Sequence, residues 1–189
     1  MRSAAAYSPR HFSSLGSAAA IWQALARLTK AGKLRRIRRG LYDLPKAHPL
    51  LGRTAPDPMA VVEALMKDSG AQWQFSGAYA ANRLGLSEQV PAKILVLTDG
   101  PPRRVPLGKL VLIFRHAAPR NLLGANRPAG LVIQALRHLR KTGLAPAHVD
   151  RLRLQLDPVT KAELAGLHAQ LPGWMQPVVA TIAAPITRS

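Results

Sequence analysis

The stretch "LGSAAAIWQALARLTKAGKLRRIRRGLYDLP", residues 15–45, predicts a helix followed by a short basic hairpin. Ser17 belongs to the residue types that cap helices, and Gly32 to those that end them. Between them, apolar side chains recur at helical spacing, at Ile21, Ala24, Leu25 and Leu28. We therefore expect one amphipathic helix over residues 17–31.

Shorter elements flank this helix on both sides. The segment "SPRHFSSLG", residues 8–16, has a capping serine and an early proline, so it predicts a short helix joined to the next by a tight turn. On the other side, "KLRRI" and "LYDL" predict two strands around "RRG", with Gly40 in the left-handed conformation. Two helices and a basic hairpin in this order predict a winged helix-turn-helix.

The face of the 17–31 helix opposite the apolar stripe is small, polar and basic, which suits a helix that enters the major groove of DNA. Gln23 can bond adenine at two points, and Ala19 can contact a thymine methyl group. The basic side chains can hold the phosphate backbone. The predicted DNA-binding residues are Ser17, Ala19, Gln23, Arg27, Lys30, Lys33, Arg35, Arg36, Arg38 and Arg39. Trp22 is expected to pack against the preceding short helix.

Positive charge is concentrated at the N-terminal end of the chain. The 189 residues contain 27 Lys and Arg against 9 Asp and Glu, a formal net charge of +18. Residues 1–42 contain nine of these bases and no acid, because Asp43 is the first acidic residue. This excess favours a polyanionic partner. No apolar run approaches the roughly 18 residues that a membrane span needs, so no membrane partner is expected.

A proline-rich stretch divides the chain into two expected domains. The segment "PKAHPLLGRTAPDP", residues 45–58, contains four prolines. We expect a DNA-binding domain at residues 1–46, a linker at 47–57 and a second domain at 58–189. The predicted fold class is α+β, with the N-terminal winged helix followed by a mixed α/β domain and a C-terminal helical segment. Its expected helices are 58–70, 77–86, 127–142, 146–155, 157–171 and 174–184, and its expected strands are 92–100 and a hairpin at 103–117.

The sequence contains no pattern typical of a catalytic site. Cysteine is absent, the nine acids are dispersed, the six histidines lack metal-ligand spacing, and there is no glycine-rich phosphate loop. We therefore expect no enzymatic activity, no metal and no cofactor. A second basic patch could extend a nucleic-acid footprint or face an acidic protein. It consists of Arg103, Arg104, Lys109, Arg115 and Arg120.

Several blocks, in consistent order through nearly the whole chain, resemble the AbiEi-type antitoxins of bacterial type IV toxin–antitoxin systems. They are "HFSSLGSAAAIWQALARLTKAGKLRRIRRGLYDLPK", "SGAYAANRLGL", "PAKILVLTDGPPRRV" and "FRHAAPRNL". The resemblance implies a winged-helix domain that represses its own operon by binding repeats in the promoter, with double-stranded DNA as partner. It also implies a C-terminal domain that counteracts a nucleotidyltransferase-type toxin without necessarily forming a stable complex with it.

Two further expectations follow from this resemblance. A repressor of this kind is expected in the cytoplasm, associated with the nucleoid. Members of the family normally carry a helix before the "SPRHF" block, where only "MRSAAAY" stands in this chain, so that first helix is expected to be truncated or missing.

Two other classes of function compete with the DNA-binding antitoxin. The alternative is an RNA-binding protein that uses the basic hairpin and the central basic patch. RNA recognition favours aromatic residues among the basic ones, whereas Tyr42 is the one aromatic residue beside the hairpin. A nucleotide-transferring enzyme or nuclease would need clustered carboxylates, which the dispersed acids do not supply.

Overall fold

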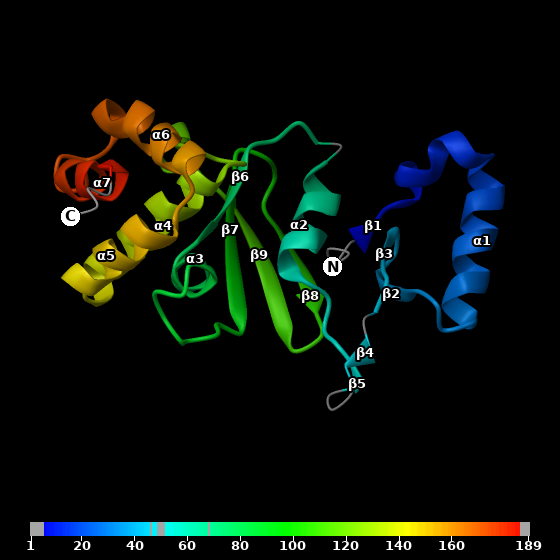
Figure 1. Cartoon of the computed structure of the whole chain (residues 1–189). Helices are drawn as coiled ribbons and strands as arrows, with labels where there is room; N and C mark the ends of the chain where they lie inside the picture. Colours follow the sequence, from blue (N-terminus) through cyan, green and yellow to red (C-terminus); the bar gives the residue numbers. More distant parts are fainter. Residues whose placement is uncertain (1–5, 46, 49–51, 68, 186–189) are drawn as a thin grey trace. The chain divides into compact units, whose positions relative to one another are not determined.

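The computed structural model describes residues 6–45, 47–48, 52–67 and 69–185. It confirms the α+β class, since it contains helices and small sheets (Figure 1). The chain forms two compact units. The first comprises Met1–Gly70 with Val105–Val111, and the second comprises Ala71–Arg104 with Leu112–Ser189. The expectation of a truncated or missing first helix concerns the segment before residue 8, of which residues 1–5 lie outside the described residues.

The first unit contains a three-stranded antiparallel sheet into which two helical elements are inserted. Its elements follow one another as β1 (Ala6–Tyr7), η1 (Pro9–Leu15), α1 (Ala18–Lys30), β2 (Arg35–Arg38) and β3 (Leu41–Asp43). The strand order is β1-β3-β2, so the first strand joins the hairpin along β3. The helix and hairpin predicted from residues 15–45 are both present.

Two short strands and a helix continue the first unit. The strands β4 (Ala47–His48) and β5 (Gly52–Arg53) pair antiparallel within the stretch predicted to be a linker. Asp57 then caps α2 (Pro58–Met66) by accepting a hydrogen bond from the backbone N–H of Met59. Val61 and Val62 on this helix are fully buried, and the helix packs against β1. The first unit extends to Gly70, beyond the predicted linker at residues 47–57.

The second unit contains most of a four-stranded sheet. The strands of this sheet and the helix among them are β6 (Trp73–Ser76), α3 (Ala78–Arg83), β7 (Lys93–Thr98), β8 (Arg103–Leu107) and β9 (Leu110–His116), in the strand order β6-β7-β9-β8. Strands β6 and β7 run antiparallel, with Phe75 opposite Val96. The turn of the hairpin formed by β8 and β9 falls at Gly108, whose φ is +65°. The tip of this hairpin, Val105–Val111, belongs to the first unit.

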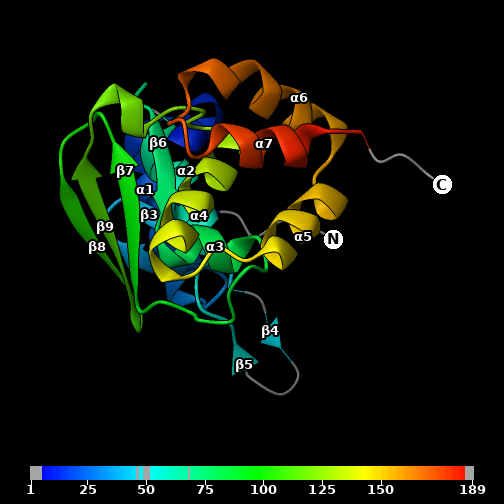
Figure 2. The ribbon, with the colours of Figure 1, turned by 90° about the vertical axis from the view of Figure 1, so that its left-hand side faces the viewer.

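Helices complete the second unit. They are α4 (Pro128–Thr142), α5 (Pro146–Gln155), α6 (Pro158–Leu167) and α7 (Gln176–Ala183), with the 3₁₀ turns η2 (Pro119–Asn121) and η3 (His168–Gln170). Proline at the first position favours the start of α4, α5 and α6 because its missing N–H has no partner there. Figures 1 and 2 show α4–α7 on one side of strands β6, β7 and β9, where their buried side chains form a shared core.

Candidate nucleic-acid interface

The outer face of α1 is open to solvent, as predicted. Leu25 is buried and Ile21 and Ala24 are half-buried, which places this part of the apolar stripe against the rest of the first unit, whereas its fourth predicted member, Leu28, is 39% exposed. On the opposite face Ala19, Gln23 and Ala26 are exposed. The small alanine side chains leave the helix backbone accessible, which is the geometry that a close approach to base edges requires.

The ends of α1 are fixed by local backbone chemistry. Ser17 Oγ accepts a hydrogen bond from the N–H of Ala20 at 3.3 Å, so this predicted DNA contact is also the helix cap. At the other end Gly32, at φ +68°, donates to the carbonyl of Thr29, and Lys33 donates to that of Leu28. This glycine-ended cap confirms the predicted end of the helix.

Three bases lie at or just after the C-terminal end of α1. Arg27, Lys30 and Lys33 are exposed, and within the described residues none of them pairs with a carboxylate. Arg27 and Lys30 lie in the last helical turn, where the negative end of the helix dipole favours positive charge. Their charges are therefore available to an external anion.

The hairpin β2–β3 presents a second set of bases. Arg36 lies opposite Tyr42 and Arg38 opposite Leu41, with Ile37 as an extra residue between them. Leu34 and Ile37, three positions apart, could not share one face of a regular strand, and this extra residue breaks the regular alternation between them. Arg36, Arg38 and Arg39 are exposed, and Gly40 has the predicted left-handed conformation at φ +75°.

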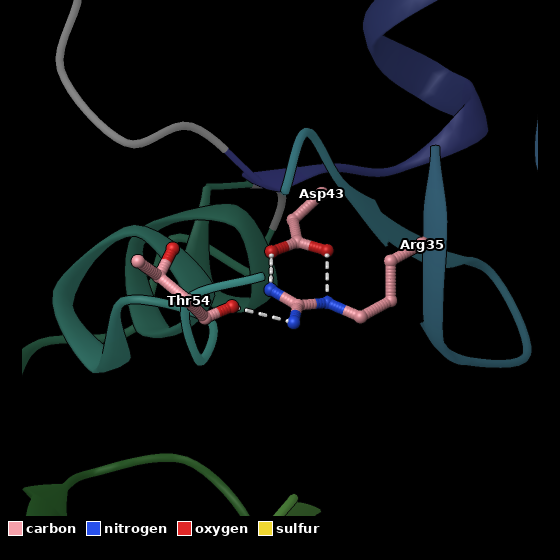
Figure 3. Close-up of polar contacts among 3 residues, drawn as sticks. All are labelled: Arg35, Asp43 and Thr54. Atoms are coloured by element: carbon pink, nitrogen blue, oxygen red, sulfur yellow. Dashed lines mark hydrogen bonds and ion pairs between the residues drawn. The ribbon is translucent and has the colours of Figure 1, made fainter. Parts of the chain in front are cut away.

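Arg35 requires a correction, because its guanidinium is used inside the protein (Figure 3). Its Nε and Nη2 atoms donate to the two carboxylate oxygens of Asp43 at 2.9 and 2.5 Å, and Nη1 donates to the carbonyl of Thr54 at 2.7 Å. Asp43 is only 6% exposed. We therefore remove Arg35 from the predicted DNA-binding set. With the predicted turn at residues 38–40, Arg35 stands opposite Asp43 on the partner strand. The register of the predicted hairpin could therefore have identified this ion pair.

The Trp22 ring of α1 lies near the turn of the hairpin. A methyl group on Gly40 would stand 3.9 Å from Cη2 of the Trp22 ring, which is 42% exposed. The ring also lines a cavity of about 700 Å³ in the first unit, together with Pro9 of η1 and Leu65 of α2. The side chain thus lies near the hairpin turn, which was not predicted, and its packing against the preceding short helix stays a prediction.

One member of the second predicted basic patch is used inside the protein. Arg103 lies over the ring of Phe114 at 4.5 Å, on the buried side of β8, whereas its neighbour Arg104 is exposed. Arg115 is exposed on β9 and Arg120 on η2, while Lys109 belongs to the hairpin segment that groups with the first unit. Strand alternation thus separates Arg103 from the exposed members of the set.

A basic cluster that the sequence analysis did not single out lies on α4. The segment "RHLRK" contributes Arg137, His138, Arg140 and Lys141. The sequence signal for this cluster was four basic or titratable residues in five positions near a helix end.

In the part of the chain that the structure describes, no group of His, Cys, Asp or Glu is arranged to hold a metal ion, and no helix is long and apolar enough to cross a membrane.

Comparison with known proteins identifies a family whose function is not known. The family model DUF6088, described as a family of unknown function, matches residues 4–164. No curated protein matches the chain. Among solved structures, the crystal structure of the RV2827C protein from Mycobacterium tuberculosis is similar at a TM-score of 0.41 and 17% identity, over 96% of this chain and 73% of that one. On the family match, which spans most of the sequence, the chain belongs to the DUF6088 family.

Proposed function

We propose that the first unit binds double-stranded DNA and that the protein is an autorepressing antitoxin. The observation that carries the DNA-binding proposal is the exposed, acid-free surface of α1 and the hairpin. Residues 1–42 contain no acid, and Asp43, the first one, is buried against Arg35. An external polyanion would neutralise this surface without meeting a competing carboxylate.

The topology of the first unit supports a winged-helix reading of this surface. A strand, two helical elements and a hairpin follow one another, and β1 pairs with β3 to give the order β1-β3-β2. In that arrangement α1 is the recognition helix and the β2–β3 turn is the wing. The Trp22 ring lies beside Gly40, so it would limit the movement of the wing against α1.

The proposal divides the residues into two roles. Gln23, with Ala19 and Ala26 beside it, would read base edges in the major groove, and Ser17 would hold the helix end near the backbone. The phosphate-binding set consists of Arg27, Lys30, Lys33, Arg36, Arg38 and Arg39, all exposed. If each of these six neutralises one phosphate, log affinity falls with log salt at a slope of roughly −5.

The antitoxin part of the proposal is supported by the resemblance to AbiEi-type proteins. The protein would act at the nucleoid in the cytoplasm, repress its own promoter, and counteract a nucleotidyltransferase-type toxin. A growth assay tests this part. Co-expression should rescue cells from the toxicity of the protein encoded next to it, and failure of rescue by a folded chain would contradict an antitoxin role.

The DNA-binding part is tested by fluorescence anisotropy of the full chain. Two labelled duplexes of equal length are compared at two salt concentrations: the region upstream of its own coding sequence and a scrambled version. We expect about a hundredfold preference for the upstream duplex that persists at the higher salt. Equal and steeply salt-sensitive binding to both would reject sequence recognition. Tighter binding to a single-stranded RNA of the same length would favour the RNA-binding alternative.

A further inference from the structure

A second cavity, of about 650 Å³, lies wholly within the second unit. It is formed by the C-terminal half of α4 and by β6 and β7 of the sheet. Leu95 and Leu97 line it from β7, and both are only half-buried. Its volume is within the range of small-molecule sites in proteins. It is therefore large enough for a compact organic ligand.

The charged side chains that line this cavity are all basic. Arg137, His138, Arg140 and Lys141 line it, and no carboxylate is among its lining residues. Within the described part of the chain these four side chains form no ion pair. The positive charges of Arg137, Arg140 and Lys141 repel one another, and no carboxylate in the cavity lining offsets them. The cavity is thus electrostatically suited to a ligand that carries more than one negative charge.

Arg137 is held in place by neutral groups. Its Nη1 atom donates to Oδ1 of Asn121 at 2.8 Å, and its Nη2 atom donates to the carbonyl of Arg120 at 2.9 Å. Burial, and then the nearby charge of Arg120, lower the pKa of Arg137 from its usual value. Within the described residues, three of its five N–H bonds have no protein partner. The guanidinium is oriented but its charge is not compensated.

A polar network fixes the wall beside Arg137. Ser76 Oγ donates to Oε1 of Gln134 at 3.1 Å, and Nε2 of Gln134 donates to the carbonyl of Asn121 at 2.7 Å. Gln134 is only 2% exposed, so this network is part of the folded core. Because Asn121 accepts from both Gln134 and Arg137, the position of the guanidinium is tied to the sheet and to α4.

The remaining walls are apolar or aromatic. Leu95 and Leu97 lie on one side, and Trp174 on another, with the guanidinium of Arg140 stacked over its ring at 4.4 Å. A free inorganic ion would leave these surfaces empty. A ligand with both a polyanionic group and a flat or apolar body would use both parts of the cavity.

We propose that this cavity binds a nucleoside diphosphate, with the phosphates on Arg137 and Lys141 and the nucleoside against Leu95 and Leu97. Arginine can bind two phosphate oxygens at once, and lysine adds a point charge. The site lies in the second unit and shares no residue with the surface of α1 and the β2–β3 hairpin. It is therefore independent of the proposed DNA binding.

Isothermal titration calorimetry of the full chain with ADP tests the proposal, with adenosine and inorganic pyrophosphate as partial ligands. ADP should bind at one site, pyrophosphate at least tenfold more weakly, and adenosine without measurable heat. Arg137→Gln and Lys141→Gln should each weaken ADP binding at least fivefold. Arg83→Gln, which removes an exposed charge at the end of α3, should change it less than twofold.

Lys141 is exposed, so Lys141→Gln tests the site even where Arg137→Gln disturbs folding. Equal weakening by Arg83→Gln would show a non-specific effect of net charge and overturn the proposal. So would an affinity for pyrophosphate equal to that for ADP. The proposal would also be overturned if ADP did not bind and a single-stranded octanucleotide bound in the cavity instead. That result would assign these residues to nucleic-acid binding.

Discussion

Arg35 and Asp43 face each other across the β2–β3 hairpin, and their two-point contact withdraws both charges from its exposed face. The pair also reaches the carbonyl of Thr54, so it joins the hairpin to the chain that leads into α2. It leaves Arg36, Arg38 and Arg39 as the exposed arginines of the hairpin. Of the five basic residues at positions 33–39, Arg35 is therefore structural, and the other four are exposed on the surface.

Arg35→Ala should destabilise the first unit. It leaves the Asp43 carboxylate, 6% exposed, without its partner, and breaking such a buried pair costs about 3 kcal/mol. Thermal and denaturant unfolding measure the loss. Arg36→Ala, at the exposed neighbouring position, should change stability by less than about 0.5 kcal/mol. A larger loss for Arg36→Ala than for Arg35→Ala would contradict this division of the hairpin.

Gln23→Ala should affect sequence preference, whereas the wing arginines should affect affinity. Without the Gln23 amide, the ratio of affinities for the upstream and scrambled duplexes should fall by about tenfold at constant salt slope. The double variant Arg38→Ala and Arg39→Ala should weaken both duplexes alike and flatten the salt slope by about two. Anisotropy titrations over a range of salt separate the two effects. The same pattern from both variants would refute the separate roles.

Trp22→Ala should weaken binding to every duplex equally. The ring borders Gly40 in the hairpin turn, so its removal frees the wing from α1 and costs about 1–2 kcal/mol of stability, less than for a fully buried tryptophan. Anisotropy on both duplexes and a thermal melt measure these changes. A selective loss on the upstream duplex, with unchanged stability, would instead mean that Trp22 contacts bases.

The local patterns of the sequence predicted the helices and the hairpin, because caps, periodicity and turns act over a few residues. The 17–31 helix was predicted closely, and the helix expected at 157–171 corresponds to α6 followed by η3. Strand β6 was not predicted, since Gln74 and Phe75 are both buried and the segment lacks alternation. Nor could local patterns show that Arg103 lies on Phe114, because that contact depends on how two strands pair.

The functional residues, like the fold, were predictable only where local sequence patterns determine them. Exposure of Gln23 and Arg27 followed from their position opposite an apolar stripe. The cavity on α4 needed the tertiary structure, because its walls come from β6, β7 and the segment around Trp174 as well as from the helix. A basic segment at a helix end does not by itself indicate a cavity.

Gly130→Ala should strongly destabilise the second unit. A Cβ at Gly130 would stand 2.2 Å from the carbonyl oxygen of Gly124, a backbone atom that cannot yield without moving the turn before α4. We expect a loss of about 3 kcal/mol, at the upper end for overpacking. Gly166→Ala is the matched control within α6, where a Cβ meets nothing within 4 Å. It should stabilise by about 0.5–1 kcal/mol in denaturant unfolding. Equal effects of the two substitutions would contradict the close approach.

Asp157 should give α6 a stability that is lost in acid. Its carboxylate accepts hydrogen bonds from Thr160 Oγ1 at 2.6 Å and from Thr160 N at 2.9 Å, and these lower its pKa below the usual value of 3.8. Because the folded pKa is the lower one, the stabilisation is complete above the unfolded pKa and disappears as pH falls through the folded pKa.

Thr160→Val isolates the hydroxyl, which makes the largest contribution to that shift. The variant should raise the pKa of Asp157 toward its usual value, as measured by an NMR titration of the carboxyl carbon. Thermal melts between pH 6 and pH 3 should then show a smaller acid-dependent loss than in the unaltered chain. Thr142→Val, which removes a hydroxyl bonded to a backbone carbonyl instead, should leave the titration of Asp157 unchanged. If the midpoint in Thr160→Val equals that of the unaltered chain, the hydroxyl is not the cause.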